Sequence, residues 1–224
     1  MAGRHPSGKD RMTDELALSS DGTRLVLARH GQTPSNVVHA LDTLPPGPAL
    51  TDEGRRQARA LADRLADEKV LAIRASRAVR AQQTAAPLAR HHGLDVEVVD
   101  GTQEIYVGDL EGTTDGESRQ RFEDVYQSWH FGDIDVPMPG GETGREALAR
   151  FLGAARHALD GASGGSVVLV SHGAMLRLAA AHLAADVDAA SANAAYLPNT
   201  GVIVLEPAPT PTGWHCVEWD GLGI

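Results

Sequence analysis

The chain contains very little cysteine or lysine, and it has no long hydrophobic run. Among its 224 residues Cys216 is the only cysteine, so no internal disulfide can form. Lysine occurs only at positions 9 and 69, which leaves arginine as nearly the whole basic charge. No hydrophobic stretch approaches the length that crosses a membrane. These absences argue against a disulfide-built scaffold and against a membrane-spanning chain.

Net positive charge is also lacking. Thirty acidic side chains face twenty lysines and arginines, which gives a net charge of −10 at neutral pH. This balance argues against nucleic acid or an anionic membrane surface as a partner. An anionic ligand would therefore have to be held by a few local arginines. The polar start of the sequence lacks the apolar core of a signal peptide, so we expect a cytoplasmic protein.

The pattern of the chain predicts one α/β domain. A flexible lead-in is expected at residues 1–22 and a single catalytic domain at residues 23–224. Apolar runs that alternate with helical patterns predict a three-layer α/β/α arrangement around a mostly parallel sheet, whose exposed edges are compatible with a homodimer. Strands are expected at residues 23–28, 70–75, 96–99, 166–170, 201–205 and 214–219, and helices from residue 51 or 52 and at residues 80–92, 122–129, 143–159 and 174–185.

Two strand ends carry histidine between polar residues. Arg-His-Gly-Gln-Thr at residues 29–33 follows the first apolar run, and Ser-His-Gly at residues 171–173 follows a later one. If both strands are parallel, both imidazoles emerge at the same edge of the sheet. Arginine suits a phosphoryl group because its planar fork makes two charge-assisted hydrogen bonds. Histidine can act as a nucleophile, an acid or a base. The pattern therefore indicates phosphoryl transfer through a histidine.

Other polar residues can complete such a site. Arg80 lies in the first turn of a predicted helix, where anions are favoured, and the Asn36 amide can donate to a phosphate oxygen. After the third predicted strand, a carboxylic acid can protonate a leaving alkoxide. Glu104, Asp109 and Glu111 all lie in that segment, and their spacing along the chain does not decide between them.

The chain resembles the histidine phosphatase superfamily, which includes the cofactor-dependent phosphoglycerate mutases. The resemblance begins with Arg-His-Gly-x-Thr-x-x-Asn at residues 29–36 and ends with Ser-His-Gly at residues 171–173. Between them, in the family's order, lie matches at residues 50–58, 76–85, 104–112 and 139–142. It implies a phosphoglycerate mutase-like fold.

The resemblance also implies roles for individual residues. His30 would attack phosphorus and become a phosphohistidine. Glu104 would protonate the leaving oxygen and then activate water. No metal or other cofactor is implied. The residues that would hold the phosphoryl group and the substrate are Arg29, Gln32, Thr33, Asn36, Arg80, His172 and Gly173.

The expected function is a metal-independent phosphomonoesterase that acts on a small phosphorylated metabolite. A phosphoglycerate mutase is the first alternative. Mutases of the family carry Glu-Arg-His-Tyr-Gly around the acid, whereas this chain has Glu-Ile-Tyr-Val-Gly at residues 104–108. Arg119 and Arg121 remain as candidates for holding an anionic tail of the substrate. The second alternative is a non-catalytic module that binds a phosphate ligand on the same fold.

Overall fold

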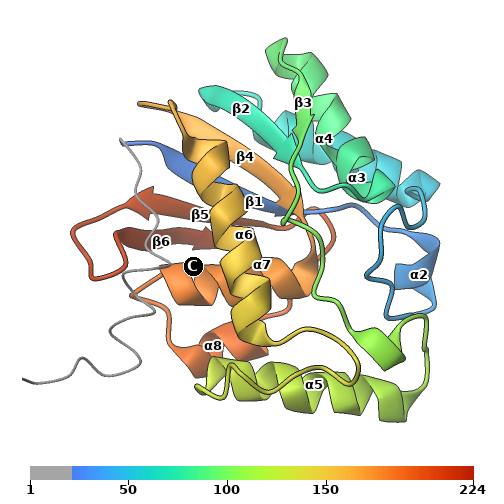
Figure 1. The fold of residues 1–224 in the computed structure, drawn as a ribbon. Coiled ribbons are helices and arrows are strands. Elements are labelled where there is room, and N and C mark those ends of the chain that lie inside the picture. The colour runs from blue at the N-terminus through green and yellow to red at the C-terminus, as the bar shows by residue number, and fades with distance from the viewer. Residues whose placement is uncertain (1–21) are drawn as a thin grey trace, which may run out of the picture.

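The computed structural model describes residues 22–224, which form a six-stranded sheet with helices on both faces (Figure 1). Apart from Gly22, the lead-in expected at residues 1–22 lies outside the described residues. None of the described helices has both the length and the apolar character that a membrane span requires. The strands are β1 (Arg24–Arg29), β2 (Val70–Ala75), β3 (Val96–Val98), β4 (Ser166–Ser171), β5 (Val202–Pro207) and β6 (Trp214–Trp219). The helices are α2 (Pro34–Val37), α3 (Asp52–Arg64), α4 (Val79–His92), the 3-10 turn η1 (Gly108–Leu110), α5 (Gly116–His130), α6 (Gly144–Leu159), α7 (Gly173–Leu183) and α8 (Ala189–Ala194).

The sheet is mostly parallel, as predicted. Its strand order is β3-β2-β4-β1-β5-β6. Strands β1 to β4 run in the same direction, while β5 pairs antiparallel with both β1 and β6. The carboxyl ends of β1, β2 and β4 therefore meet at one edge, and the start of β5 lies at the same edge because β5 runs the opposite way.

Two apolar clusters hold the three layers together. Along β1, Leu25 and Leu27 pack into the cluster under α6 and α7, whereas Val26 and Ala28 face the cluster under α3 and α4. This alternation follows from the two-residue period of a strand that is buried on both faces. All four side chains are buried, so β1 is fixed from both sides and the residue that follows it has a well-defined position.

Capping residues set several helix ends where the sequence predicts them. The Thr51 side chain accepts a hydrogen bond from the Gly54 amide at the start of α3. Thr143 and Glu146 form a capping box at the start of α6. Helix α4 ends at Gly93, whose φ of 66° is the left-handed conformation that glycine adopts most easily.

The bounds predicted for the helix at residues 122–129 were partly wrong. Helix α5 begins at Gly116, six residues before the expected start, and the Asp115 side chain caps it by accepting from the Ser118 amide. The first turns of α5 are largely exposed, so they lack the apolar spacing that would have indicated a helix. The short helices α2 and α8 were not predicted either, since neither spans two full turns.

The loop after β1 packs directly against the start of α3. A Cβ atom added to Gly31 would lie 2.6 Å from the Gly54 carbonyl oxygen, and one added to Gly54 would collide with the Gln32 carbonyl oxygen. The two backbones can approach this closely only because both positions are glycine. The helix thus supports the loop that carries His30.

Replacing Gly54 with alanine should destabilise the protein although alanine favours helices. Overpacking against the Gln32 backbone is expected to lower the free energy of unfolding by about 1–3 kcal/mol. The matched control is Gly153→Ala in α6, where an added Cβ meets nothing within 4 Å and a gain of about 0.5–1 kcal/mol is expected. Urea denaturation measures both variants, and equal stability of the two would contradict the packing argument.

Candidate active site

Two histidines lie side by side at the carboxyl edge of the sheet. Strands β1 and β4 pair in parallel with Arg29 opposite Ser171, so His30 and His172 leave the sheet at neighbouring positions. Their ring centroids are 5.2 Å apart. Both side chains are buried. The structure thus brings together the two histidines that the sequence singled out.

The hydrogen bonds of His30 determine which ring nitrogen is free to react. Nδ1 lies 2.7 Å from the Gly31 carbonyl oxygen, and because a carbonyl can only accept, Nδ1 carries the proton. Nε2 therefore holds the lone pair, and it accepts a hydrogen bond of 3.3 Å from Nε of Arg80. The imidazole is oriented with its nucleophilic nitrogen toward a guanidinium.

Burial keeps both imidazoles neutral. Desolvation lowers the pKa of His30 well below 6.5, and the positive charges of Arg80 and then Arg29 lower it further. The pKa of His172 is lowered for the same reasons, burial first and Arg80 second. A neutral imidazole has the lone pair that attack on phosphorus requires.

His172 is held from the neighbouring strand. Its Nε2 lies 2.7 Å from the hydroxyl of Ser76, the residue after β2. That hydroxyl already accepts from the Ala78 amide, so its own proton is available to Nε2. Nδ1 of His172 is buried and has no hydrogen-bond partner among the described residues. With Nε2 accepting, Nδ1 carries a proton that it can donate to an oxygen of a ligand.

Arg80 is a buried cation surrounded by the loop that precedes α3. Its side chain is 2% exposed. Nη2 donates to the Asp42 carbonyl oxygen at 3.0 Å, and Nη1 lies 3.7 Å from the Asp42 carboxylate. Nη1 otherwise has no hydrogen-bond partner in the described chain. Burial lowers the pKa of Arg80, and the Asp42 charge opposes that change. Free donor capacity on a buried guanidinium is what an anionic ligand would use.

Arg29 is held at the opposite wall of the site. Its Nη1 donates to the Leu197 carbonyl oxygen at 2.7 Å and to the Tyr196 hydroxyl at 2.9 Å. Its buried Nε has no partner among the described residues. The backbone of Gly173 lies so close that a Cβ there would be 3.1 Å from this Nε. Glycine at 173 thus makes room for the guanidinium.

The orientation of the Asn36 amide follows from its neighbours. Its oxygen accepts from the Thr33 amide at 3.0 Å and from the Asn199 side chain at 3.2 Å. With the oxygen occupied by donors, the NH₂ group is the free end. Asn36 lines the cavity, so it can donate to a phosphate oxygen as predicted.

Of the three carboxylates considered from the sequence, only Glu104 lines the cavity. Its Oε1 accepts from the amides of Ile105 and Met175, and its Oε2 accepts from Ala174 alone. One lone pair of Oε2 therefore remains for a proton. Glu111 instead anchors the Thr43 amide and hydroxyl, and Asp109 packs against Gly140 on the exposed side of η1.

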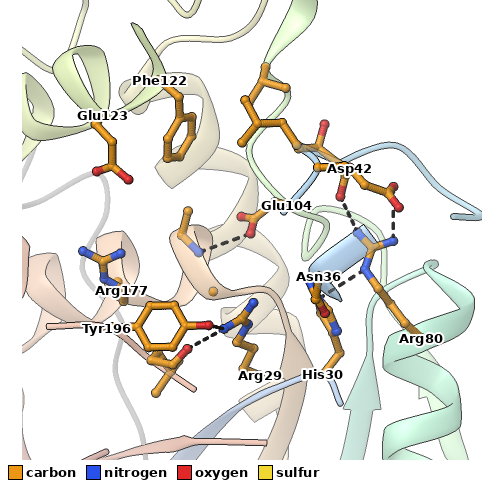
Figure 2. Close-up of a pocket in the computed structure, with 17 residues that line it drawn as sticks. Arg29, His30, Asn36, Asp42, Arg80, Glu104, Phe122, Glu123, Arg177 and Tyr196 are labelled. Carbon is orange, nitrogen blue, oxygen red and sulfur yellow. Dashed lines mark hydrogen bonds and ion pairs between the residues drawn. The ribbon is translucent and has the colours of Figure 1, made fainter. Parts of the chain in front are cut away.

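The cavity that these residues enclose measures about 230 Å³. Figure 2 shows Arg29, His30, Asn36 and Arg80 at one end, Glu104 in the middle, and Phe122, Glu123 and Arg177 at the other end. The described residues contain no cluster of three or more histidine, cysteine, aspartate or glutamate side chains placed to hold a metal ion. The positive charge around His30 comes from arginine.

Some residues expected in the site lie elsewhere. Gln32 and Thr33 do not line the cavity: the Gln32 side chain accepts from Thr51, and Thr33 caps α2. Arg119 and Arg121 do not line it either, and Arg119 donates to the His39 carbonyl oxygen. His172 lies behind the cavity wall rather than on its surface.

Several residues of the cavity wall were missed by the sequence analysis. They come from the loop before α3, from α5 and α7, and from the segment that leads into β5: Asp42, Phe122, Glu123, Arg177, Tyr196 and Leu197. The antiparallel direction of β5 would have indicated the last two, because its start must lie beside the end of β1. The chain carries no comparable signal for Asp42 or Arg177.

Comparison with known proteins identifies the family. The model of the histidine phosphatase superfamily (branch 1) matches residues 25–220. The chain therefore belongs to this superfamily, as its motifs predicted.

Relatives and solved structures agree with that assignment. The chain is 33% identical to the PE-PGRS family protein PE_PGRS11 of Mycobacterium tuberculosis, over 88% of this chain and 36% of that protein. It spans 36–41% of the length of this and three further mycobacterial relatives. It is 29% identical to a metal-independent phosphoserine phosphatase of Arabidopsis thaliana, over 75% of this chain and 71% of the relative.

A solved structure of a mycobacterial glucosyl-3-phosphoglycerate phosphatase in complex with VO3 shares the fold. Its TM-score is 0.72 at 28% identity, and the match covers 89% of this chain and 99% of that one. The phosphoglycerate mutase-like fold predicted from the sequence is thus confirmed.

The two neutral, buried histidines should make the protein sensitive to acid. Both have folded-state pKa values below 6.5, so between the folded and unfolded values the unfolded chain binds more protons. The free energy of unfolding should therefore fall as pH drops below about 6.5, by up to ~1.4 kcal/mol per pH unit for each histidine. Denaturation at pH 7.0 and 5.5 measures the slope. His172→Asn should make it shallower, and an unchanged slope would contradict the argument.

Proposed function

We propose that the protein is a metal-independent phosphomonoesterase that hydrolyses a small phosphorylated metabolite through a phosphohistidine on His30. The observation that carries this proposal is the pairing of an oriented, neutral His30 with the guanidiniums of Arg29 and Arg80. A phosphoryl group in transfer spreads negative charge over its oxygens, so positioning and fixed positive charge dominate catalysis. Membership of the superfamily supports the same reaction.

In the first step, Nε2 of His30 attacks phosphorus and the bond to the ester oxygen breaks. Arg29, Arg80, His172 and the Asn36 amide donate to the phosphoryl oxygens. Arg80 already donates to Nε2 of His30, so it must turn its donors toward the substrate as the phosphate enters. Glu104 transfers its proton from Oε2 to the leaving oxygen, which departs as an alcohol.

In the second step, water attacks the phosphohistidine. Glu104, now a carboxylate, accepts one proton from that water as the nitrogen–phosphorus bond breaks. Inorganic phosphate leaves, and His30 regains its lone pair while Glu104 regains its proton. Every protein group used in the cycle lines the cavity except His172, which lies behind the cavity wall.

Replacing His30 should abolish turnover without unfolding the protein. His30→Ala removes the attacking nitrogen, and kcat for p-nitrophenyl phosphate is expected to fall by ~10⁴-fold or more. Labelled substrate should leave acid-labile phosphate on the wild type but not on this variant. His157→Ala, at an exposed position, is the matched control. Unchanged activity of His30→Ala would refute the nucleophile assignment, and turnover that requires 2,3-bisphosphoglycerate would favour the mutase instead.

Glu104→Gln should slow poor leaving groups most. An alkyl phosphate needs a proton on its departing oxygen, so a loss of ~10²–10⁴-fold in kcat is expected. A p-nitrophenyl ester leaves without one and should lose much less in its first step. Asp109→Asn serves as the control, because Asp109 lies outside the cavity. Equal losses of the Glu104 variant on both esters, measured by single-turnover kinetics, would contradict the acid role.

A further inference from the structure

The end of the cavity farthest from His30 carries one positive and one negative side chain, and neither forms a salt bridge with a described residue. Arg177 from α7 and Glu123 from α5 both line the cavity, and Figure 2 shows them on the far side of Glu104. No salt bridge joins either side chain to another residue in the range 22–224. Unpaired charges on a cavity wall are available to a ligand.

Arg177 is rigidly placed. Its Nη2 donates to the Asn193 carbonyl oxygen at the end of α8, and its guanidinium carbon lies 5.1 Å from the centre of the Tyr126 ring. Its buried Nε has no partner among the described residues. Arg177 lines the cavity and keeps unused donor capacity, so it can bind a planar anion such as a carboxylate. Because the net charge of the chain is −10, attraction for such an anion has to come from local arginines.

Glu123 presents the complementary charge. It is exposed, and no hydrogen bond or ion pair joins it to another residue of the described chain. A carboxylate here can bind an ammonium group or hydroxyl donors, and it would repel a second anion. Glu123 and Arg177 form no salt bridge with each other, and both line the same cavity.

The reaction geometry decides which part of the substrate meets these charges. In the proposed function, which this inference deepens, the phosphoryl group lies at His30 and the ester oxygen at Glu104. The rest of the leaving group must therefore extend toward Phe122, Tyr196, Arg177 and Glu123. A cavity of about 230 Å³ has room for a small leaving group.

We propose that this end of the cavity selects a leaving group with both a carboxylate and an ammonium group, as an amino-acid alcohol has. Arg177 binds the carboxylate with charge-assisted hydrogen bonds, and Glu123 pairs with the ammonium group. Phe122 and Tyr196 form the apolar walls around the carbon atoms between them. Arg177 and Glu123 are thus specificity-determining residues, and the phosphate end of the cavity is common to all substrates.

Four alkyl phosphates test the two charges separately. O-phosphoserine carries both groups, 3-phosphoglycerate only the carboxylate, phosphoethanolamine only the ammonium group, and glycerol 3-phosphate neither. For the wild type, we expect kcat/KM to be highest for O-phosphoserine, which both charges bind, and lowest for glycerol 3-phosphate, which neither charge binds.

Variants then assign each preference to a residue. Arg177→Met should lower kcat/KM for the two carboxylates by about 10- to 100-fold relative to the other two esters. Glu123→Gln should lower it for the two ammonium esters by about 2- to 5-fold relative to the others, a smaller effect because Glu123 is exposed. The matched controls are Arg119→Met and Asp124→Asn, since neither residue lines the cavity; both should keep the wild-type ratios.

The ratios of kcat/KM between the four esters distinguish failure of the proposed function from failure of the charge selection. If no ester is hydrolysed, the proposed function fails. If all four are hydrolysed and each variant changes them equally, the phosphatase stands and the charge selection is wrong. Should Arg177→Met not fold, as judged by circular dichroism, Arg177→Lys and the exposed Glu123→Gln carry the test. A wild type that prefers glycerol 3-phosphate would overturn the inference outright.

Discussion

The parallel pairing of β1 with β4 is the constraint on which the site depends. Because Arg29 lies opposite Ser171, the two histidines that follow must leave the sheet together. A shift of one residue would turn the side chains of β1 to the opposite faces and expose the leucines and valines that are now buried in two separate cores. The hydrophobic pattern that stabilises the sheet therefore also sets the distance between the imidazoles.

Burying Arg80 creates the second requirement. A guanidinium removed from water needs compensating partners, and the loop before α3 supplies them through the Asp42 carbonyl oxygen and carboxylate. That loop is itself anchored by Glu111 on Thr43, and it needs glycine at position 47, where a Cβ would collide with the Arg80 guanidinium. Glu111 thus affects the site indirectly, because it anchors the loop whose Asp42 compensates the buried charge of Arg80 beside His30.

Functional residues could be predicted from the sequence where they follow a regular strand or belong to a known motif. His30, His172 and Arg80 could be placed because each lies just after or near the end of a buried parallel strand. The choice of Glu104 over Asp109 and Glu111 required the resemblance, because all three lie in one irregular segment. Asp42 and Arg177 could not be found this way. Asp42 lies in an irregular loop, and Arg177 lies on α7 beyond its first turn, so neither directly follows a strand end. Arg119 and Arg121, the candidates for an anionic tail of the substrate, lie on α5 but do not line the cavity.

The two ends of the cavity differ in how firmly they are built, and this difference suits their proposed roles. Around His30, the side chains of His30, Arg80 and His172 are buried, and the polar groups come from strand ends and from the helices or loops fixed to them. Around Arg177 and Glu123 the walls come from α5, α7 and the exposed Tyr196. Phosphoryl transfer needs groups that are placed in advance of the reaction, whereas a specificity surface can vary without disturbing them. Substitutions at the outer end can therefore change substrate preference while the groups around His30 stay in place.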